Sequence, residues 1–506
     1  MPDLERPAPG LIPSPDASPP QLPTLTVITD LVGHLANQQG NPGGKLGEKP
    51  NRSWAADQAG KTAGQTPGTD LAELLPGIQL TPHQQQALAE LAAFVDSGRK
   101  LHLLTGYAGT GKTTLLQALV VCLRQQDPKL AIAFTALSNK ATKVLAAMGD
   151  RWGLNVDCLT CCRILGLKPS IDRDTGQQKF TADRQGKRLI NRYRLVIVDE
   201  CSMINQEMWG LLVKAVSRLD DQTQLLFVGD QAQLPPVGEA VSPCFEQIYD
   251  RTELTEVMRY GGAIGLIAEN VRRHLDRPAL PRWQSDTNAD KTQGTFILAR
   301  PHWEKLLLRA FTSEAYSNNP DQVRALTYTN RRVQQLNHRI RTEIYGPEAA
   351  QFVIGERLMA NSPCLLDDGG IVLQTSEECE VLDAGIDQVD DPITLEPWQI
   401  WEMKIVTETG LYRQLRVLHE QEQQRFETSL KALANSKSWK AFWELKQYFH
   451  ELNYAYSLTV HKSQGSTFQD VFVDLPNLSL NRKITERNQL CYVAFTRAAN
   501  RLFLCQ

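Results

Sequence analysis

The sequence has no long hydrophobic run and almost no net charge. None of its apolar stretches approaches the ~18 residues that a membrane span needs, so we expect no membrane partner. The formal net charge is −3, and the 42% hydrophobic and 22% charged residues are ordinary values for globular proteins. These values exclude a wholly disordered chain, a collagen and a coiled coil. They also exclude attraction of nucleic acid by bulk charge, but not by a local basic groove.

Cysteine is sparse and scattered. Of the ten cysteines only Cys158, Cys161 and Cys162 form a cluster, whereas a zinc site usually needs four ligands. We therefore expect reduced thiols rather than a metal site. The first ten residues, MPDLERPAPG, also lack the basic-then-apolar order of a signal peptide. Together these features favour a cytoplasmic protein.

The first 75 residues differ in composition from the rest. Eight prolines fall within the first 25 residues, and stretches rich in Gly, Asn and Gln follow. Such a segment buries too little apolar surface to offset its chain entropy, so residues 1–75 are predicted to be a disordered tail. Within it, residues 24–36 (TLTVITDLVGHLA) have the character of a short helix or a docking peptide.

From about residue 76 the pattern becomes that of an α/β protein. Residues 80–95 are predicted to be a helix, because Thr81 can cap it, Pro82 suits its first turn and apolar residues recur at helical spacing. Short apolar strands then alternate with helical stretches, which indicates parallel sheets. The first set of strands is predicted at 101–105, 130–135, 195–198 and 224–228, and the second at 324–328, 471–474 and 502–504. The alternating apolar residues of about 346–410 predict a small antiparallel insertion between them.

Residues 106–113, GYAGTGKT, match the phosphate-binding pattern G-x-x-x-x-G-K-[ST]. An apolar strand precedes the motif and a helical stretch follows it, as the pattern requires. The glycines allow backbone N–H groups to surround phosphate oxygens at a helix N-terminus, whose dipole favours negative charge. Lys112 supplies a positive charge to the β- and γ-phosphates, and Thr113 supplies a hydroxyl to Mg²⁺.

A second element of this site is expected at RLVIVDECSM (194–203). Four apolar residues form a strand, and Asp199 and Glu200 follow at its carboxyl end, where ligands bind in parallel sheets. Asp199 suits the metal, and Glu200 suits activation of water because a carboxylate is a natural general base. Together the two motifs predict a nucleotide triphosphatase with ATP and Mg²⁺ as substrate and cofactor.

A third strand leads to GDQAQLPPVG (229–238), whose polar tip leaves the same sheet edge. At this point the chain resembles a superfamily 1 helicase, most similar to the RecD- and Dda-like branch, over residues 80–506. The matching segments are LTPHQ (80–84), GYAGTGKT, FTALSNKA (134–141), VDECSM (198–203), GDQAQLPPV, LTEVMRY (254–260), LTYTNRRV (326–333), YSLTVHKSQGSTF (456–468) and LCYVAFTRA (490–498).

The resemblance implies two RecA-like parallel-sheet motor domains with the nucleotide between them. The expected domains are 76–255, with a β-hairpin insertion at about 168–190, then 256–345 together with 452–506, and finally an inserted SH3-like β-barrel with a helical part at 346–451.

The implied nucleotide site consists of Gln84 (at the adenine), Gly106, Gly109, Thr110, Gly111, Lys112, Thr113, Thr114 and Gly465. The implied metal ligands are Thr113 and Asp199. The implied catalytic residues are Lys112, Glu200, Gln233, Arg259 and Arg497, the two arginines reaching the γ-phosphate from the second domain.

Three segments are candidates for contact with nucleic acid. Residues 324–341 hold five arginines and no acid, and Arg331 and Arg332 are the proposed phosphate contacts, unless the segment is a solvated helix face. The resemblance implies strand contacts by His461, Lys462 and Gln464 of HKSQG. It also implies a strand-separating hairpin with Phe180 at or near its tip, although an exposed Phe on a loop is the alternative.

Two further segments carry open alternatives. WKAFWELKQYF (439–449) holds five aromatic residues, which suit either base stacking or a helix core. We favour the core, with Trp439, Phe442, Trp443 and Phe449 near one stripe. LTCCRILGL (159–167) departs from the Thr-Ile-His of many relatives, so strand contact through Cys161 or Cys162 is in doubt.

The sequence therefore predicts an ATP-dependent DNA helicase that moves on single-stranded DNA and at single-strand/duplex junctions, with 5′-to-3′ movement implied by the resemblance alone. An RNA helicase with the same motor and a nucleotide-switch ATPase without unwinding activity are the alternatives. The resemblance also implies a working monomer, and the tail is a candidate contact for a replication or repair protein.

Overall fold

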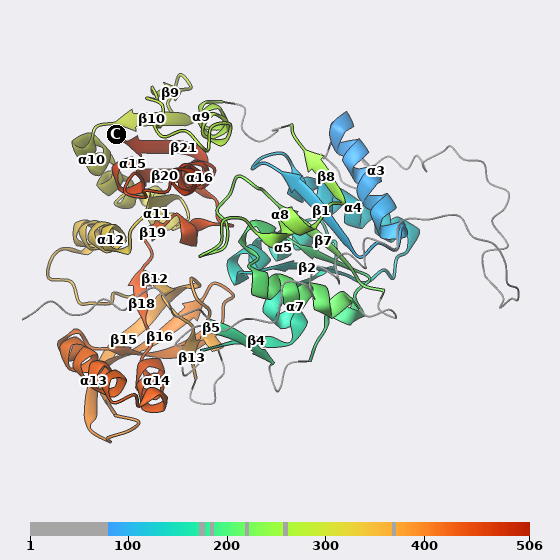
Figure 1. Cartoon of the computed structure of the whole chain (residues 1–506). Coiled ribbons are helices and arrows are strands. Elements are labelled where there is room, and N and C mark those ends of the chain that lie inside the picture. The colour runs from blue at the N-terminus through green and yellow to red at the C-terminus, as the bar shows by residue number, and fades with distance from the viewer. Residues whose placement is uncertain (1–78, 172–177, 183–186, 218–221, 257–261, 367–370) are drawn as a thin grey trace, which may run out of the picture. The chain divides into compact units, whose positions relative to one another are not determined.

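The computed structural model describes residues 79–171, 178–182, 187–217, 222–256, 262–366 and 371–506. The predictions for the tail (1–75) and for Arg259 lie outside these residues. The described chain is an α/β protein with two six-stranded sheets, one five-stranded sheet and two pairs of strands (Figure 1). None of its described helices is both long enough and apolar enough to cross a membrane.

The first sheet is parallel throughout, in the order β3-β2-β6-β7-β1-β8. It confirms the four strands predicted in this part of the chain, which are buried because both faces of the sheet carry helices. Its strands are β1 (Leu101–Gly106), β2 (Ile132–Ala136), β3 (Asp157–Thr160), β6 (Leu195–Val198), β7 (Gln224–Gly229) and β8 (Arg251–Leu254).

Helices connect these strands and cover the sheet. The predicted helix at 80–95 is α3 (Pro82–Asp96), and Thr81 and Gln84 cap its start reciprocally, each accepting a hydrogen bond from the other's backbone N–H. Leu91 and Phe94 of α3 are fully buried against the sheet's core. The other helices are α4 (Lys112–Gln126), α5 (Asn139–Arg151), α6 (Cys161–Leu165), α7 (Gln206–Val216) and α8 (Pro243–Gln247).

The second sheet has the order β19-β11-β20-β21-β10-β9, and only β9 is antiparallel to its neighbour. It confirms the three strands predicted in the later part of the chain. Its strands are β9 (Asp286–Thr287), β10 (Gly294–Leu298), β11 (Val323–Thr327), β19 (Ser457–Thr459), β20 (Phe468–Asp474) and β21 (Ala498–Cys505). Its helices are α9 (Ala263–Arg272), α10 (Arg300–Phe311), α11 (Glu314–Asn318), α12 (Asn330–Tyr345), α15 (Leu475–Leu478) and α16 (Ile484–Phe495).

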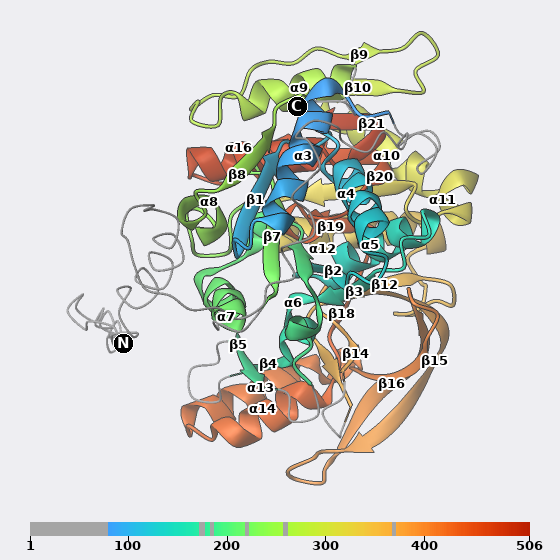
Figure 2. The ribbon, with the colours of Figure 1, turned by 90° about the vertical axis from the view of Figure 1, so that its right-hand side faces the viewer.

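The insertion predicted between the later strands is an antiparallel sheet, in the order β17-β16-β15-β12-β18, with a separate β13–β14 pair. Figure 2 shows β15 and β16 as a long, curved pair of strands. The strands are β12 (Arg357–Ala360), β13 (Cys364–Leu365), β14 (Ile371–Leu373), β15 (Glu378–Asp390), β16 (Pro397–Thr407), β17 (Tyr412–Leu418) and β18 (Leu452–Tyr454). Helices α13 (Gln423–Asn435) and α14 (Trp439–Tyr448) follow β17. The SH3-like description and the domain boundaries stay predictions.

The aromatic helix α14 corrects one expectation. Phe449, just after the helix, is buried with Leu445 in a core that includes Trp398 and Phe426. The other three members of the expected core stripe, Trp439, Phe442 and Trp443, are only half-buried and pack mainly on one another, with ring centroids 5.7 and 5.1 Å apart. The core side of α14 is therefore narrower than the stripe suggested.

A short antiparallel hairpin is inserted in the first sheet's part of the chain, as expected. It pairs β4 (Leu167–Ile171) with β5 (Gln178–Ala182). Phe180 lies in the middle of β5, opposite Pro169, and its side chain is half-buried. Residues 172–177, between the two strands, lie outside the described residues, and Phe180 belongs to strand β5.

A buried ion pair fixes the inserted sheet to the second sheet. Arg324 on β11 is fully buried, and its guanidinium donates to both carboxylate oxygens of Glu378 on β15, at 3.3 and 3.1 Å. Burial alone would raise the pKa of the Glu378 carboxyl, but the charges of Arg324 and Lys140 lower it below its ordinary value. Both partners are thus charged, and each depends on the other.

Glu378→Gln would therefore leave the buried Arg324 with the exposed carboxylate of Asp321, at 3.1 Å, as its remaining ion-pair partner. We expect the variant to lose about 3–5 kcal/mol of stability, because removal of one partner of a buried pair exposes the full desolvation cost of the other. Thermal unfolding measures the change as a lower Tm. The matched control is Asp383→Asn on the same strand, whose exposed pair with Lys404 should leave Tm almost unchanged. Equal Tm values for both variants would contradict this account.

Candidate nucleotide-binding site

The loop between β1 and α4 has the conformation that its glycines permit. Gly109 and Gly111 have φ of 81° and 82°, in the left-handed region that other residues rarely adopt. A Cβ on Gly111 would lie 2.5 Å from the Gln84 amide nitrogen, and one on Gly106 would lie 2.6 Å from the Thr110 hydroxyl. Side chains at either position would therefore displace the loop.

Lys112 begins α4, and its ammonium faces the loop. Its Nζ donates to the carbonyl oxygens of Gly106 at 2.6 Å and Tyr107 at 3.0 Å. Thr113 and Thr114 follow in the first turn of α4, half-buried. The free N–H groups of this turn and the ammonium together give the loop the chemistry of an anion site.

Gln84 holds the loop from α3. Its side-chain amide donates to the Thr110 carbonyl at 3.1 Å, and its amide oxygen accepts from Thr81 N at 3.1 Å. The expected adenine contact of Gln84 stays a prediction, since this side chain is already bound to the loop.

Asp199 and Glu200 follow β6 at its carboxyl end. Asp199 accepts a hydrogen bond from the Glu200 backbone N–H at 2.8 Å, and Glu200 has φ of 53°. A left-handed conformation of a residue other than glycine costs on the order of 1–3 kcal/mol and is found mostly at functional sites.

Burial and charge set the protonation of this pair. Burial raises the pKa of Asp199, while the Glu200 N–H and Lys112 oppose that rise. Burial, and next the Asp199 charge, raise the pKa of Glu200 to about 7, against the opposing charges of Arg497 and Lys112. Lys112 at the start of α4 and Arg497 just after α16 therefore both lower the pKa of one carboxylate.

The segment after β7 contributes Asp230 and Gln233. The Gln233 side-chain oxygen is buried with no hydrogen-bond partner among the described residues, while its backbone carbonyl accepts from Gln489 Nε2 at 3.0 Å. A buried amide oxygen without a partner is costly and marks a place where a ligand or water supplies a hydrogen bond.

Asp230 connects the phosphate loop to α16. One of its carboxylate oxygens accepts from Ala108 N at 2.9 Å and from the Tyr492 hydroxyl at 2.7 Å. The Tyr492 oxygen also accepts from Ala108 N at 2.9 Å. Arg272 of α9 adds a second contact, with its guanidinium 3.5 Å from the centre of the Tyr107 ring.

Sequence reasoning missed Tyr492, Gln489 and Arg272. Tyr492 lies within the recognised segment LCYVAFTRA, but nothing local distinguishes a buried tyrosine that packs from one whose hydroxyl reaches a carboxylate more than 260 residues away. Arg497, the predicted member of that segment, is buried and donates to the carbonyls of Val493 and Ser466 at 3.2 and 3.1 Å.

The HKSQG segment lies beside α5. Gly465 has φ of 73°, and a Cβ there would approach Ala141 of α5 to 3.4 Å. Lys462 donates to Asn361 Oδ1 at 2.9 Å, and burial lowers the pKa of both Lys462 and His461. Gln464 is buried, and its side-chain nitrogen has no hydrogen-bond partner among the described residues.

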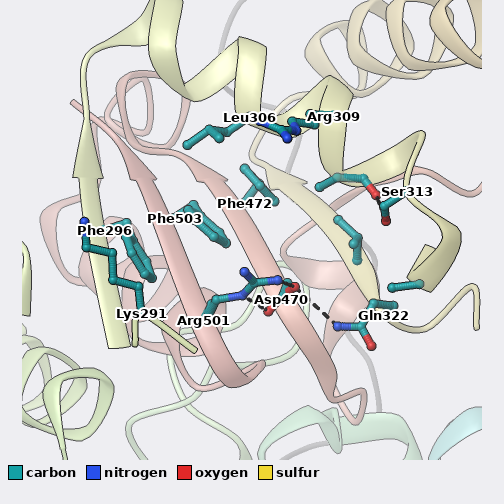
Figure 3. A pocket seen from close by; sticks show the side chains of 13 residues that line it. Lys291, Phe296, Leu306, Arg309, Ser313, Gln322, Asp470, Phe472, Arg501 and Phe503 are labelled. Carbon is teal, nitrogen blue, oxygen red and sulfur yellow. Dashed lines mark hydrogen bonds and ion pairs between the residues drawn. The ribbon is translucent and has the colours of Figure 1, made fainter. Parts of the chain in front are cut away.

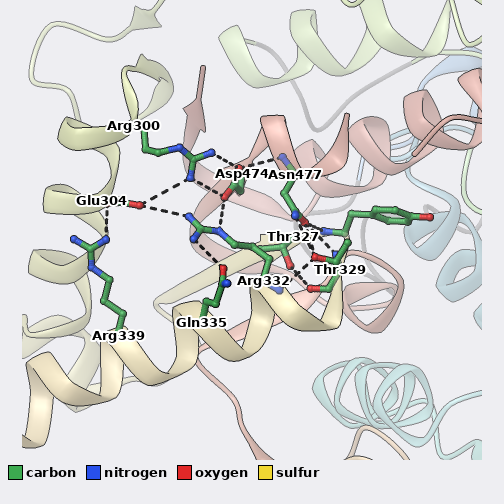
Figure 4. Close-up of polar contacts among 10 residues, drawn as sticks. Arg300, Glu304, Thr327, Thr329, Arg332, Gln335, Arg339, Asp474 and Asn477 are labelled. Atoms are coloured by element: carbon green, nitrogen blue, oxygen red, sulfur yellow. Dashed lines mark hydrogen bonds and ion pairs between the residues drawn. The ribbon is translucent and has the colours of Figure 1, made fainter. Parts of the chain in front are cut away.

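The charge argument for residues 324–341 needs correction. Arg332 pairs with Asp474 at 2.8 Å and approaches Glu304 at 3.5 Å, and Arg339 pairs with Glu304 at 2.5 Å (Figure 4). Arg324 and Arg341 are paired inside the fold with Glu378 and Glu356. Only Arg331 is exposed without an ion pair among the described residues. The stretch therefore does not present five free charges, because carboxylates distant in the sequence neutralise four of them.

The two cysteines of the divergent segment lie at the start of α6. Cys161 is fully buried and Cys162 is half-buried. Burial raises the pKa of the Cys161 thiol to about 12 and that of Cys162 to about 11, so both are protonated at neutral pH. These side chains have the character of packing residues.

Tyr492→Phe tests the link through Asp230, since it removes the hydroxyl and keeps the ring. We expect ATP turnover stimulated by single strands to fall about tenfold, because a hydrogen bond to a charged group contributes about 1.5–3 kcal/mol. Steady-state ATPase assays measure the effect. Tyr193→Phe, which removes a similar 2.8 Å bond to Asp157 far along the first sheet, is the matched control. Wild-type turnover in Tyr492→Phe would refute the role of this link.

Comparisons with known proteins agree with this site. Residues 79–281 match the family described as an AAA domain, and residues 454–505 match the UvrD-like helicase C-terminal domain. The ATP-dependent DNA helicase Dda of Enterobacteria phage T4 is 23% identical over 84% of this chain and 98% of its own length. The RecD subunit of the Mycolicibacterium smegmatis RecBCD enzyme is 32% identical over 37% of this chain and 35% of its own.

Among solved structures, the Pif1 helicase from Candida albicans aligns with 84% of this chain and 94% of its own, at 20% identity and a TM-score of 0.42. The sequence matches cover both the segment that carries the phosphate loop and the segment that carries Tyr492 and Arg497. The chain belongs to the superfamily 1 helicases of the Pif1, RecD and Dda type and is, by that homology, an ATP hydrolase.

Proposed function

We propose that this helicase unwinds DNA by moving 5′-to-3′ along a single strand, with ATP hydrolysis as the energy source. One observation carries the proposal of a two-domain motor: Asp230, just after β7 of the first sheet, accepts hydrogen bonds both from Ala108 N of the phosphate loop at 2.9 Å and from the Tyr492 hydroxyl of α16 at 2.7 Å. Dda, which matches almost over its whole length, is named as a DNA helicase, and this favours DNA as the substrate.

In the proposed reaction the phosphate loop and Lys112 hold the β- and γ-phosphates of ATP. Glu200 accepts the proton of the attacking water, and Gln233 offers its unpartnered side-chain oxygen to that water or to a γ-phosphate-linked group. Arg497 stabilises the charge that develops on the transferred phosphoryl oxygens. We also assign the γ-phosphate to Arg259, from its place in the motif.

The oxygen ligands for Mg²⁺ are the Thr113 hydroxyl and the Asp199 carboxylate. Mg²⁺ is a hard cation that prefers oxygen ligands. A hydroxyl and a carboxylate beside an anion-binding loop therefore suit it. Bound there, Mg²⁺ supplies positive charge to the phosphate oxygens. The charges of Lys112 and Arg497 then complete the neutralisation of ATP by this chain's own residues.

Movement follows from the contacts between the two parallel sheets. Asp230, Tyr492 and Gln489 join the loops that bind phosphate to α16, so a change of nucleotide state is transmitted to the second sheet. In a cycle where the two RecA-like domains close on ATP and open again after hydrolysis, one domain would move along the nucleic-acid strand.

For the DNA strand we propose contacts by His461, Lys462 and Gln464, and by Arg331 as the exposed phosphate contact of α12. Arg332 stays a candidate phosphate contact, although its guanidinium is already paired with Asp474. The β4–β5 hairpin is the proposed strand separator, with Phe180 on its second strand.

Lys112→Ala tests the phosphate site. We expect kcat for ATP hydrolysis to fall by about 100-fold or more, because a positioned cation stabilises charge that is present mainly in the transition state. Single-strand binding should persist, since Lys112 faces the loop. A colorimetric phosphate assay and fluorescence anisotropy of a labelled oligonucleotide measure the two properties. Lys129→Ala, an exposed lysine of the same lobe, is the control. Normal hydrolysis by Lys112→Ala would show that the loop is not the phosphate site.

Unwinding of duplexes with single-stranded overhangs tests direction and substrate together. We expect rapid strand separation when the overhang has a free 5′ end, and little when it has a free 3′ end, in DNA. Matched RNA duplexes should be unwound more slowly. Preference for the 3′ overhang would reverse the polarity. Faster unwinding of RNA would identify an RNA helicase, and strand-independent ATPase without unwinding would identify a nucleotide switch.

A further inference from the structure

A groove of about 420 Å³ lies on one face of the second sheet, between its strands and the helices α10 and α11 (Figure 3). It is not part of the nucleotide site. Phe472 and Phe503 point into the core shared with α10, whereas their strand neighbours Val471 and Leu502 pack with Tyr492 of α16 on the opposite face. The sheet therefore separates the groove from α16.

The floor of the groove is a row of three phenylalanines. Phe296, Phe503 and Phe472 are direct neighbours across β10, β21 and β20. Adjacent ring centroids are 4.8 and 4.3 Å apart, with interplanar angles of 19° and 11°. Stacking therefore covers both faces of the central Phe503 ring and one face of each of its two neighbours. Leu306 of α10, which is 37% exposed, adds an aliphatic wall.

The rim carries positive charge without an opposing carboxylate. Lys291 and Arg309 are exposed and form no ion pair within the described part of the chain. The one acid in the lining, Asp470, is buried, bound by Arg501 through two hydrogen bonds and by Gln322 at 3.3 Å. A ligand therefore meets an apolar floor beside two unpaired cations.

We propose that this groove binds a peptide segment of a partner protein in which a bulky apolar or aromatic side chain stands beside carboxylates. The apolar side chain would fill the space above the phenylalanine row, and the carboxylates would pair with Lys291 and Arg309. Burial of apolar surface supplies affinity, and the rim charges supply specificity and association rate.

A nucleic-acid strand fits these features less well. Base stacking needs an open aromatic face, and here stacking within the row covers both faces of Phe503 and one face each of Phe296 and Phe472. The hydrocarbon wall formed by Leu306 and the neighbouring alanine of α10 also offers no hydrogen bonds to a base. Peptide binding is therefore favoured on shape and chemistry.

The test uses fluorescence anisotropy to measure how tightly the full chain binds a fluorescein-labelled pentapeptide, three aspartates followed by a C-terminal Leu-Phe pair. The double variant Lys291→Glu/Arg309→Glu should bind it roughly tenfold more weakly or worse, with a reduced dependence on salt. Both sites are exposed, so the fold should be retained. Lys305→Glu, an exposed lysine of α10 outside the groove, is the matched control and should bind normally.

Two peptide controls separate the contributions. Replacing the terminal Leu-Phe by alanines should weaken binding through the floor, and replacing the aspartates by asparagines should weaken it through the rim. Strand-stimulated ATPase should be unchanged in Lys291→Glu/Arg309→Glu, because neither residue belongs to the nucleotide or strand machinery.

Three outcomes would overturn the proposal. Equal peptide affinity of wild type and the double variant would remove the groove as the site. Displacement of the peptide by short oligo(dT), with oligo(dT) binding itself weakened in the double variant, would assign the groove to nucleic acid. Self-association in sedimentation velocity that the same variant abolishes would assign it to a second copy of this chain.

Discussion

The Asp230 carboxylate is the contact on which the coupling of the two parallel sheets depends. It follows β7 at the carboxyl end of that strand, yet it binds the phosphate loop through Ala108 N and the second sheet's α16 through Tyr492. A carboxylate that accepts two such hydrogen bonds in a buried place fixes its donors more strongly than neutral acceptors do. The loop that binds phosphate and the helix that precedes Arg497 are therefore held by one side chain.

The contact through Asp230 also bears on the protonation of Glu200. A carboxylate with a pKa of about 7 is poised to exchange a proton near neutral pH, and its environment combines burial with cations of both sheets. The two charges that favour the ionised form of Glu200, those of Lys112 and Arg497, lie 385 positions apart in the sequence. Separation of the sheets would remove one of them and raise the cost of the ionised form. In the proposed reaction, the protonation of Glu200 would therefore depend on the distance between the two sheets.

Most of the scaffold of this site follows from local sequence. The apolar runs that became β1, β6 and β7 are short and mostly buried, and two glycines of the phosphate loop have the positive φ that other residues resist. What local sequence does not contain is the partner of a long side chain. In the sequence Arg332 looks like a free charge. In the structure it lies 2.8 Å from Asp474, which comes more than 140 residues later. Likewise, helical spacing placed Trp439 in a core, although the surface that α14 covers is set by strands of another segment.

The inserted sheet contacts the second sheet and α5 through ion pairs around Glu378 that differ in burial. Arg324 and Glu378 are both buried, so their separation would cost more than that of an exposed pair, and the inserted sheet is expected to move with the second sheet. The contacts of α5 with the same inserted sheet are different in kind. Lys140 reaches Glu378 at 3.2 Å, and Lys143 reaches Glu377 and Glu408 at 3.2 and 2.9 Å, but both lysines keep access to water. Water can replace the pairs of Lys143 at little cost, whereas Lys140 shares the buried Glu378 with Arg324. The contacts of α5 with the inserted sheet are therefore weaker than the buried pair that joins the inserted sheet to the second sheet.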